Sequence, residues 1–228
     1  MPRLPFITFE GSEGCGKSTQ VSLLASRLTN AGIPLLVTRE PGGTGIGEKI
    51  RHLLQFAPES IAMTPETELL LFEASRSQLV REVIQPALDR GTVVISDRFA
   101  DSTTVYQGVA RRLDQEMVGH LNKFAVGSCW PDLTFLLDID VETASARMLQ
   151  RVRPSAGVDR MESEAPNFYE AVCRAYRELA AREPYRIRVI DGTRSIQEIE
   201  NEVWDVISTR FRDLAQLVMT SRRSLRHL

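Results

Sequence analysis

Residues 11–19 read Gly11-Ser12-Glu13-Gly14-Cys15-Gly16-Lys17-Ser18-Thr19 and match the phosphate-loop pattern G-x-x-x-x-G-K-[ST] at every fixed position. The apolar run Leu4–Phe9 precedes them and predicts a buried strand. The segment Gln20–Ala31 follows, with apolar residues at mostly helical spacing. A strand, this loop and a helix form the context in which the pattern binds phosphate. The alternative, a glycine-rich turn that binds nothing, leaves both flanks unexplained.

The residue types of this loop suit the phosphates of a nucleotide. Its glycines let backbone N–H groups converge on phosphate oxygens, and the start of the following helix adds a favourable partial charge. We expect Lys17 to reach the transferring phosphates and the Ser18 hydroxyl to ligate Mg²⁺. Cys15 is interpreted as a small filler side chain, with a redox switch as the weaker alternative.

Composition narrows the class of protein. The 228 residues suit one large α/β domain or at most two small ones, and the formal net charge of −2 gives no overall field that attracts nucleic acid. No apolar run approaches the roughly 18 residues of a spanning helix, and residues 1–5 are too short and proline-rich for a signal peptide. Three widely separated cysteines indicate free thiols and no structural zinc. We therefore expect a cytoplasmic protein without membrane or nucleic-acid partners.

Strands and helices are predicted to alternate along the chain. After the first strand, short apolar runs predict four more, at residues 33–38, 92–96, 133–138 and 185–190. Helical patterns are predicted at residues 46–56, 65–88, 101–107, 114–126, 141–150, 167–182 and 196–211. Strands that are almost continuously apolar and alternate with helices indicate an α/β fold, a five-stranded parallel sheet with helices on both faces. Pro86 is expected to bend or interrupt its helix.

No internal repeat, low-complexity segment or linker divides the chain. The sequence therefore predicts a single domain over residues 1–213, followed by a C-terminal tail at 214–228. The tail carries Arg222, Arg223 and Arg226, and it is expected to extend the last helix or to fray. A basic tail on its own is weak support for a nucleic-acid partner.

Polar residues follow the predicted strands at their carboxyl ends, where open parallel sheets bind ligands. The phosphate loop follows the first strand, Arg39-Glu40 the second, and Asp97-Arg98 the third. Asp97 could support Mg²⁺ directly or through water, and Arg98 could clamp a second phosphate bidentately. An ordinary surface ion pair is the alternative interpretation of Asp97 and Arg98.

Two further stretches suit phosphoryl transfer to a base-containing acceptor. Residues 151–160 are rich in helix breakers, carry Arg151, Arg153 and Arg160, and are interpreted as a lid that supplies cations and excludes water. A solvated basic loop is the alternative. Phe72 and Arg76 share a helix face, where they could stack on a base and bond its edge, although Phe72 could equally belong to the core.

Four stretches resemble those of a known family: Phe9–Thr19, Thr38–Thr44, Leu70–Arg76 and, most specific, Asp97–Gly108. On these stretches the chain resembles the bacterial thymidylate kinases, over roughly residues 6–211. The resemblance implies the P-loop nucleoside-monophosphate-kinase fold. It implies phosphorylation of dTMP to dTDP with ATP and Mg²⁺, as a step of dTTP synthesis for DNA replication. It also implies a homodimer packed through helices.

The resemblance also implies roles for single residues. The ATP-binding residues would be Gly11, Ser12, Glu13, Gly14, Cys15, Gly16, Lys17, Ser18 and Thr19. The catalytic residues would be Lys17, Arg98, Arg151 and Arg153, the last two reaching the ATP phosphates from the lid. Mg²⁺ would be held by Ser18 and Asp97. The residues that bind dTMP would be Glu13, Glu40, Arg51, Phe72, Arg76, Arg98, Thr103, Tyr106 and Gln107.

Within the dTMP site the implied roles differ. Phe72 would stack on thymine, and Arg76 and Gln107 would bond the base edge, with Thr103 nearby. Tyr106 would pack beneath the sugar and disfavour a 2′-hydroxyl. Glu13 would lie near the 3′-hydroxyl or the metal. The dTMP phosphate would be held by Arg51 and Arg98, in a site that Glu40 helps to order.

The chain also departs from the family pattern. Cys15 stands where the family usually has Ala or Ser, Val105 where it usually has Ala, and Pro154-Ser155 interrupts the lid. The phosphate loop lacks an arginine, as in the subtype whose catalytic arginine comes from the lid, and whether Arg151 or Arg153 has that role stays open. Two other functions stay open too: a kinase for a different nucleotide or nucleoside, and a nucleotide-dependent switch without transferase activity.

Overall fold

A computed structural model describes residues 4–57, 60, 62–150, 160 and 164–224, with side chains described as far as residue 220. Within these residues lies a single sheet of five strands: β1 (Phe6–Glu10), β2 (Leu35–Arg39), β3 (Val93–Asp97), β4 (Leu133–Asp138) and β5 (Ile187–Asp191). All pairings are parallel, in the order β2-β3-β1-β4-β5. The predicted five-stranded parallel sheet is confirmed, with strand ends displaced by at most two residues.

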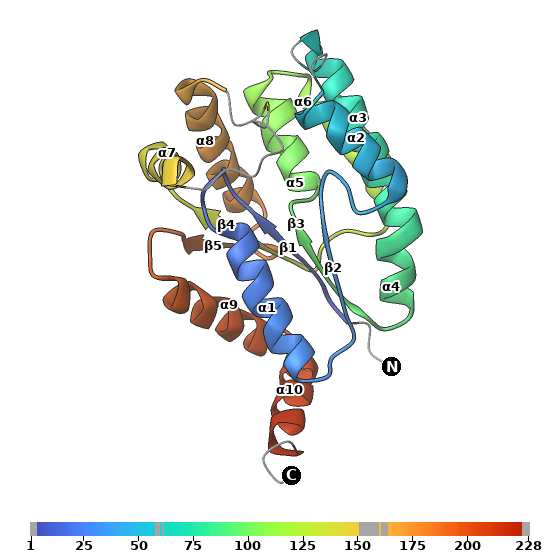
Figure 1. Ribbon diagram of the computed structural model, residues 1–228, viewed down its shortest axis with the longest axis vertical. Helices are drawn as coiled ribbons and strands as arrows, with labels where there is room; N and C mark the ends of the chain where they lie inside the picture. Colours follow the sequence, from blue (N-terminus) through green and yellow to red (C-terminus); the bar gives the residue numbers. More distant parts are fainter. Residues whose placement is uncertain (1–3, 58–59, 61, 151–159, 161–163, 225–228) are drawn as a thin grey trace.

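Helices cover both faces of this sheet, as Figure 1 shows. The described elements are α1 (Lys17–Asn30), α2 (Gly45–Gln55), α3 (Pro65–Leu79), η2 (Val80–Ile84), α4 (Gln85–Asp89), α5 (Ala100–Thr103), η3 (Thr104–Ala110), α6 (Gln115–Val126), α7 (Val141–Gln150), α8 (Pro166–Arg182), α9 (Ile196–Arg210) and α10 (Arg212–Ser224). None of them is long and apolar enough to cross a membrane, among the residues described.

The side-chain alternation of β1 explains the two layers. Ile7 and Phe9 point to one face, where they pack with residues of α1, α9 and α10. Phe6 points to the other face, where it meets Phe99 and residues of η2, α4 and α6. A strand buried on both faces needs apolar side chains at nearly every position, which is why it appears as a continuous apolar run.

Two predicted helices contain π-helical turns. The predicted helix over 65–88 consists of α3, the π-helical η2 and α4, which follow one another without a break. Pro86 lies just after η2, where its missing N–H and its ring disturb ordinary α-helical hydrogen bonding. The predicted helix at 101–107 is likewise divided into α5 and the π-helical η3. Of the two, η3 carries Tyr106 and Gln107, which line the functional site described below.

The chain after residue 211 forms a separate helix, α10. Phe211 interrupts the path from α9 to α10, and its backbone N–H caps α9 by bonding the Ile207 carbonyl oxygen. Leu214 and Val218 are buried in the core beside α9. The predicted start of the tail at residue 214 therefore falls inside a helix that packs on the domain.

A buried ion pair ties α5 to the start of β5. Arg186 donates from Nη1 and Nη2 to the two carboxylate oxygens of Asp101, at 2.7 and 2.8 Å. Thr134 on β4 accepts a further hydrogen bond from Arg186, at 3.0 Å. Only 5% of the Asp101 side chain is exposed, so its charge depends on this arginine.

We expect Arg186→Met to lower the free energy of unfolding by about 3 kcal/mol, because it leaves the Asp101 carboxylate buried without its partner. Urea denaturation followed by circular dichroism measures the loss. The matched control is Arg188→Met, at an exposed position of β5 two residues further along the chain, which should change stability by less than about 0.5 kcal/mol. Equal losses in the two variants would contradict a structural role for the buried pair.

Candidate active site

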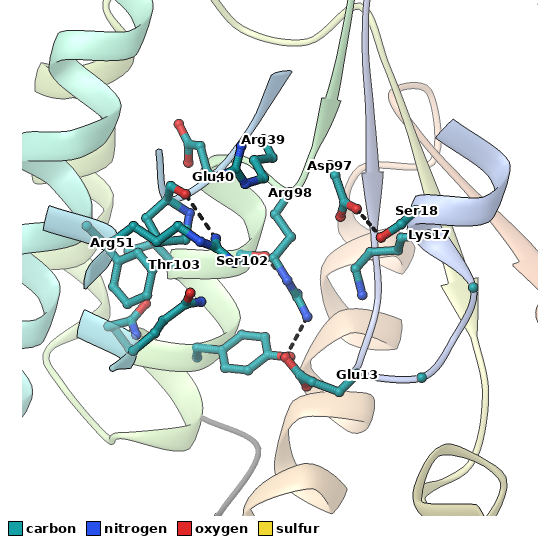
Figure 2. Close-up of a pocket in the computed structure, with 17 residues that line it drawn as sticks. Glu13, Lys17, Ser18, Arg39, Glu40, Arg51, Asp97, Arg98, Ser102 and Thr103 are labelled. Carbon is teal, nitrogen blue, oxygen red and sulfur yellow. Dashed lines mark hydrogen bonds and ion pairs between the residues drawn. The ribbon is translucent and has the colours of Figure 1, made fainter. Parts of the chain in front are cut away.

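A cavity of about 230 Å³ opens at the carboxyl ends of β1, β2 and β3. It joins the phosphate loop on one side to α2, α3 and η3 on the other, as Figure 2 shows. The residues that line it are Glu13, Gly14, Gly16, Lys17, Ser18, Arg39, Glu40, Pro41, Arg51, Gln55, Phe72, Asp97, Arg98, Ser102, Thr103, Tyr106 and Gln107. Lys17 of the phosphate loop thus lies opposite a wall of aromatic and polar side chains.

The phosphate loop packs tightly against its surroundings. A Cβ at Gly11 would lie 2.5 Å from the Leu137 carbonyl oxygen, and one at Gly14 would lie 2.8 Å from that of Ala144. Both glycines also have positive φ, which disfavours other residues. Lys17 is buried and donates to the carbonyl oxygens of Gly11 and Ser12, at 3.0 and 2.8 Å. The loop therefore holds its cation against its own backbone, beside the cavity.

Ser18 and Asp97 form the donor pair that a magnesium ion would need. The Ser18 hydroxyl donates to Oδ2 of Asp97 at 2.6 Å, across the gap between α1 and the end of β3 (Figure 2). A hydroxyl and a carboxylate are hard oxygen ligands, and Mg²⁺ often takes only one or two protein ligands and keeps several waters. No group of three or more acidic, histidine or cysteine side chains that could hold a metal occurs among the residues described. The two oxygens fit a hydrated Mg²⁺ that also binds phosphate.

Arg98 projects into the middle of the cavity from a strained backbone. Its φ is +69°, and its backbone is fixed because its N–H donates to Phe9 and the Ser96 hydroxyl donates to its carbonyl oxygen. Its guanidinium donates to Glu13 at 2.6 Å and to the Gly11 carbonyl oxygen at 2.9 Å. Figure 2 shows Arg98 and Glu13 pointing toward one another. The cation therefore lies between the phosphate loop and the acceptor half of the cavity.

Tyr106 completes this contact from η3. Its phenol donates to Oε2 of Glu13 at 2.8 Å, and the Arg98 guanidinium lies 5.2 Å from the centre of its ring. Burial raises the pKa of Tyr106 well above its usual value, so the phenol stays protonated and donates. Glu13 therefore accepts from two side chains that line the cavity and fixes their relative position.

A buried carboxylate, Glu10, lies behind Arg98. It accepts from the Phe99 N–H at 2.7 Å, from the Ser102 hydroxyl at 2.6 Å and from the Tyr176 phenol at 2.8 Å. The same hydroxyl and phenol also accept from Nη1 of Arg98, at 3.2 and 3.3 Å. Burial raises the pKa of Glu10 to about 7, and the nearby charge of Asp101 adds to the rise. Glu10 thus supports the side chains that orient Arg98.

A second buried cluster surrounds Arg76. Its guanidinium donates to Glu40 at 2.8 Å, to Glu73 at 2.8 Å and to the Thr103 hydroxyl at 2.9 Å. The side chain is 1% exposed and does not line the cavity, whereas Thr103, which accepts a hydrogen bond from it, does. Burial raises the pKa of Glu40 to about 7 in spite of the opposing charge of Arg76. With two carboxyls around one guanidinium, a proton on one of them restores electrical neutrality.

The wall opposite the phosphate loop carries the other predicted acceptor residues. Phe72, Thr103 and Gln107 line it, and Gln107 donates from Nε2 to the buried carboxylate of Glu68 at 2.7 Å. Arg51 enters from α2 and donates to the Pro41 carbonyl oxygen at 3.1 Å. The acceptor half of the cavity thus combines the cationic side chain of Arg51 with the aromatic ring of Phe72 and the polar groups of Thr103 and Gln107.

The structure brings together most of the residues that the sequence singled out. Among the described arginines of the predicted site, two do not line the cavity. Arg76 is buried behind it, and Arg160 donates to Glu68 and to the Leu54 carbonyl oxygen. Arg151 and Arg153 lie outside the described residues. Sequence reasoning missed Gln55 and Ser102, which line the cavity. Gln55 follows Arg51 by four residues within α2, so helical spacing could have identified it, whereas Arg98 lies before the start of α5 and gives no such signal for Ser102.

Comparisons with known proteins show which family this chain resembles. The family model described as Thymidylate kinase matches residues 9–203. A protein named thymidylate kinase from Thermomicrobium roseum is 48% identical over 203 residues, covering 89% of this chain and 94% of its own length. One from Geobacter sulfurreducens is 48% identical over 207 residues, covering 90% and 97%.

A solved structure shares the architecture as well. The crystal structure of thymidylate kinase from Ehrlichia chaffeensis superposes with a TM-score of 0.73 at 33% sequence identity, and the match covers 91% of this chain and 99% of that one. The range that the family model matches, residues 9–203, contains the phosphate loop and the residues that line the cavity. The chain belongs to the thymidylate kinase family.

Proposed function

We propose that this protein transfers the terminal phosphoryl group of ATP to dTMP and forms dTDP. The observation that carries the proposal is a single cavity in which a phosphate loop faces an arginine clamp and a base-sized wall of Phe72, Thr103 and Gln107. Membership of the thymidylate kinase family supports the same acceptor. The transfer is direct and in line, without a covalent enzyme intermediate.

On the donor side, residues 11–19 would hold the ATP phosphates. Backbone N–H groups at the start of α1 suit phosphate oxygens, and Lys17 would exchange its carbonyl partners for the transferring phosphate. Ser18 and Asp97 would hold Mg²⁺, which when bound offsets charge on the phosphate oxygens. Ser18 belongs to the loop and Asp97 ends β3, and both line the cavity.

On the acceptor side, Arg98 and Arg51 would hold the dTMP phosphate, with Arg39 at the same rim. Two anionic groups must approach one another during the reaction, and fixed cations lower the cost of that approach. Glu13 would keep Arg98 and Tyr106 in position beside the sugar. We place the base against Phe72, with its edge toward Thr103 and Gln107. Arg76 would act through Thr103, because its own donors bind protein groups.

The lid arginines Arg151 and Arg153 stay part of the proposal as predictions from the sequence. Their place after α7 supports it, because α7 packs against the phosphate loop at Gly14. A closed lid would exclude water and prevent hydrolysis of ATP. We also propose a cytoplasmic location, which the three buried free thiols support.

The cavity also bears on the two alternative functions. A switch protein needs a donor site alone, whereas here the phosphate loop opens into a second compartment with its own arginines. A kinase for another nucleotide would need a wall whose polar groups match the edge of a different base. In this wall the Gln107 amide and the Thr103 hydroxyl are the polar groups beside Phe72.

The acceptor is tested by screening nucleoside monophosphates with ATP and Mg²⁺. We expect kcat/KM for dTMP to exceed that for dCMP, AMP or free thymidine by at least about a hundredfold, because the wall leaves unpaired polar groups against the wrong base. Coupled detection of ADP measures the rates. Preference for another acceptor would reject dTMP, and ADP release that is independent of any acceptor would favour the switch.

Removal of the central cation tests the site geometry. We expect Arg98→Ala to lower kcat/KM for dTMP by roughly a hundred- to a thousandfold, because one fixed positive group between donor and acceptor is lost. Steady-state kinetics measures this, with circular dichroism to show that the fold is retained. Arg188→Ala, at an exposed position away from the cavity, is the control and should behave as the wild type. A loss below about fivefold for Arg98→Ala would exclude it from the reacting site.

We also propose that the protein forms a homodimer through α3 and α6. These helices pack beside one another, and they expose Leu70, Met117 and Phe124, of which Phe124 is 78% exposed. Large exposed apolar side chains gathered on neighbouring helices mark a surface that another protein covers. Helix packing between two copies would bury all three.

Sedimentation velocity tests the dimer. We expect the wild type to sediment as a dimer and Phe124→Asp as a monomer, because a charge would be buried at the contact. Tyr185→Asp, at an equally exposed aromatic residue just before β5, is the matched control and should remain dimeric. A monomeric wild type at micromolar concentration would reject the proposed association.

A further inference from the structure

A buried carboxylate behind the acceptor wall, Glu68 of α3, binds three side chains from two separate segments, the end of η3 and residue 160. It accepts from Nε2 of Gln107 at 2.7 Å, from Arg111 at 3.1 and 3.2 Å, and from Arg160. The Glu68 side chain is 1% exposed. Burial by itself would raise its pKa, but the hydrogen bonds from Arg111 and Gln107 outweigh it and lower the pKa. Glu68 is therefore an ionised group that accepts hydrogen bonds and donates none.

This charge fixes the orientation of the Gln107 amide. A glutamine can turn its amide by half a rotation and exchange its donor end for its acceptor end. Beside an ionised carboxylate only the N–H end is favourable, so Nε2 faces Glu68 and Oε1 is turned away from it. Gln107 lines the cavity, and no partner for Oε1 is found within the described part of the chain. The amide oxygen is therefore available to a ligand as an acceptor.

The neighbouring hydroxyl has the opposite polarity. Thr103 accepts a hydrogen bond from Nη2 of Arg76 at 2.9 Å, which leaves its own proton free to donate. Arg76 is held in turn by Glu40 and Glu73. The wall thus presents one acceptor and one donor next to the ring of Phe72. A thymine offers the complement, an N3–H donor beside carbonyl acceptors, whereas a cytosine offers an N3 acceptor beside an amino donor.

We propose that Glu68 is a positioning residue for base selection: by orienting the amide of Gln107, it makes the site favour bases that carry a proton at N3. Glu68 does not contact the substrate and acts through Gln107. The proposal rests on the proposed function, because it assumes that dTMP occupies this cavity. Arg111 and Arg160 contribute by keeping Glu68 ionised, and Arg160 links it to the backbone of Leu54 on α2.

The test compares dTMP with 5-methyl-dCMP, which differs from it only at N3 and C4 of the base. For each variant, the KM for dTMP and the inhibition constant of 5-methyl-dCMP against dTMP give a selectivity ratio. We expect Glu68→Gln to reduce this ratio by about tenfold, because a neutral partner lets the Gln107 amide turn and pair with either base. The KM for dTMP should rise more than kcat falls.

A general loss of structure would weaken both ligands alike and leave the ratio unchanged. Arg186→Met is the matched control, because it removes the buried ion pair with Asp101, which contacts neither Glu68 nor Gln107. It should destabilise the protein without changing the ratio. If Glu68→Gln does not fold, Glu68→Asp is measured in its place. The shorter side chain withdraws its carboxylate from Gln107, so we expect the same fall in the selectivity ratio.

Two further outcomes separate the inference from the proposed function. An unchanged ratio in a folded Glu68 variant, with dTMP still phosphorylated, overturns the inference and leaves the function standing. A wild type that binds 5-methyl-dCMP as well as dTMP also overturns it. A wild type that does not phosphorylate dTMP at all overturns the proposed function itself.

Discussion

The hydrogen bonds of the Glu10 carboxylate determine how the centre of the site is arranged. Glu10 ends the middle strand, β1, and faces the side of the sheet on which α5 and α8 pack. A carboxyl buried there needs partners, and it finds them in the Phe99 N–H and in the hydroxyls of Ser102 and Tyr176. The same contacts hold the backbone next to Arg98, whose positive φ would otherwise be costly.

The same arrangement recurs in three places around the cavity. Glu10 lies behind Arg98, Glu73 lies behind Arg76 and so behind Thr103, and Glu68 lies behind Gln107. In each case a buried carboxyl sets the direction of a polar group nearer to the cavity. A fixed direction matters for phosphoryl transfer, because groups that are already oriented need no reorganisation when charge develops.

The sequence predicted the features that depend on local pattern. Apolar runs located all five strands, and spacing identified the phosphate loop and the three strand ends that meet at the cavity. Burial of single side chains depends on tertiary packing. Arg76 shares a helix face with Phe72, yet only Phe72 reaches the cavity, because α5 covers the next turn. The sequence leaves open whether the tail extends the last helix or frays, because a short basic segment resembles a solvated tail until its buried residues, such as Leu214, are known.

The π-helical segment η3 has a consequence for evolution. It carries Tyr106 and Gln107, two adjacent residues that both line the cavity, and a wider turn separates neighbouring side chains by a smaller angle than an α-helix does. Such a turn contains one residue more than the α-helical path would need. A deletion of one residue between 104 and 110 would restore α-helical geometry and rotate the wall away from the acceptor. Substitutions at the positions of this segment that do not line the cavity would therefore leave the wall in place, whereas a change of its length would move it.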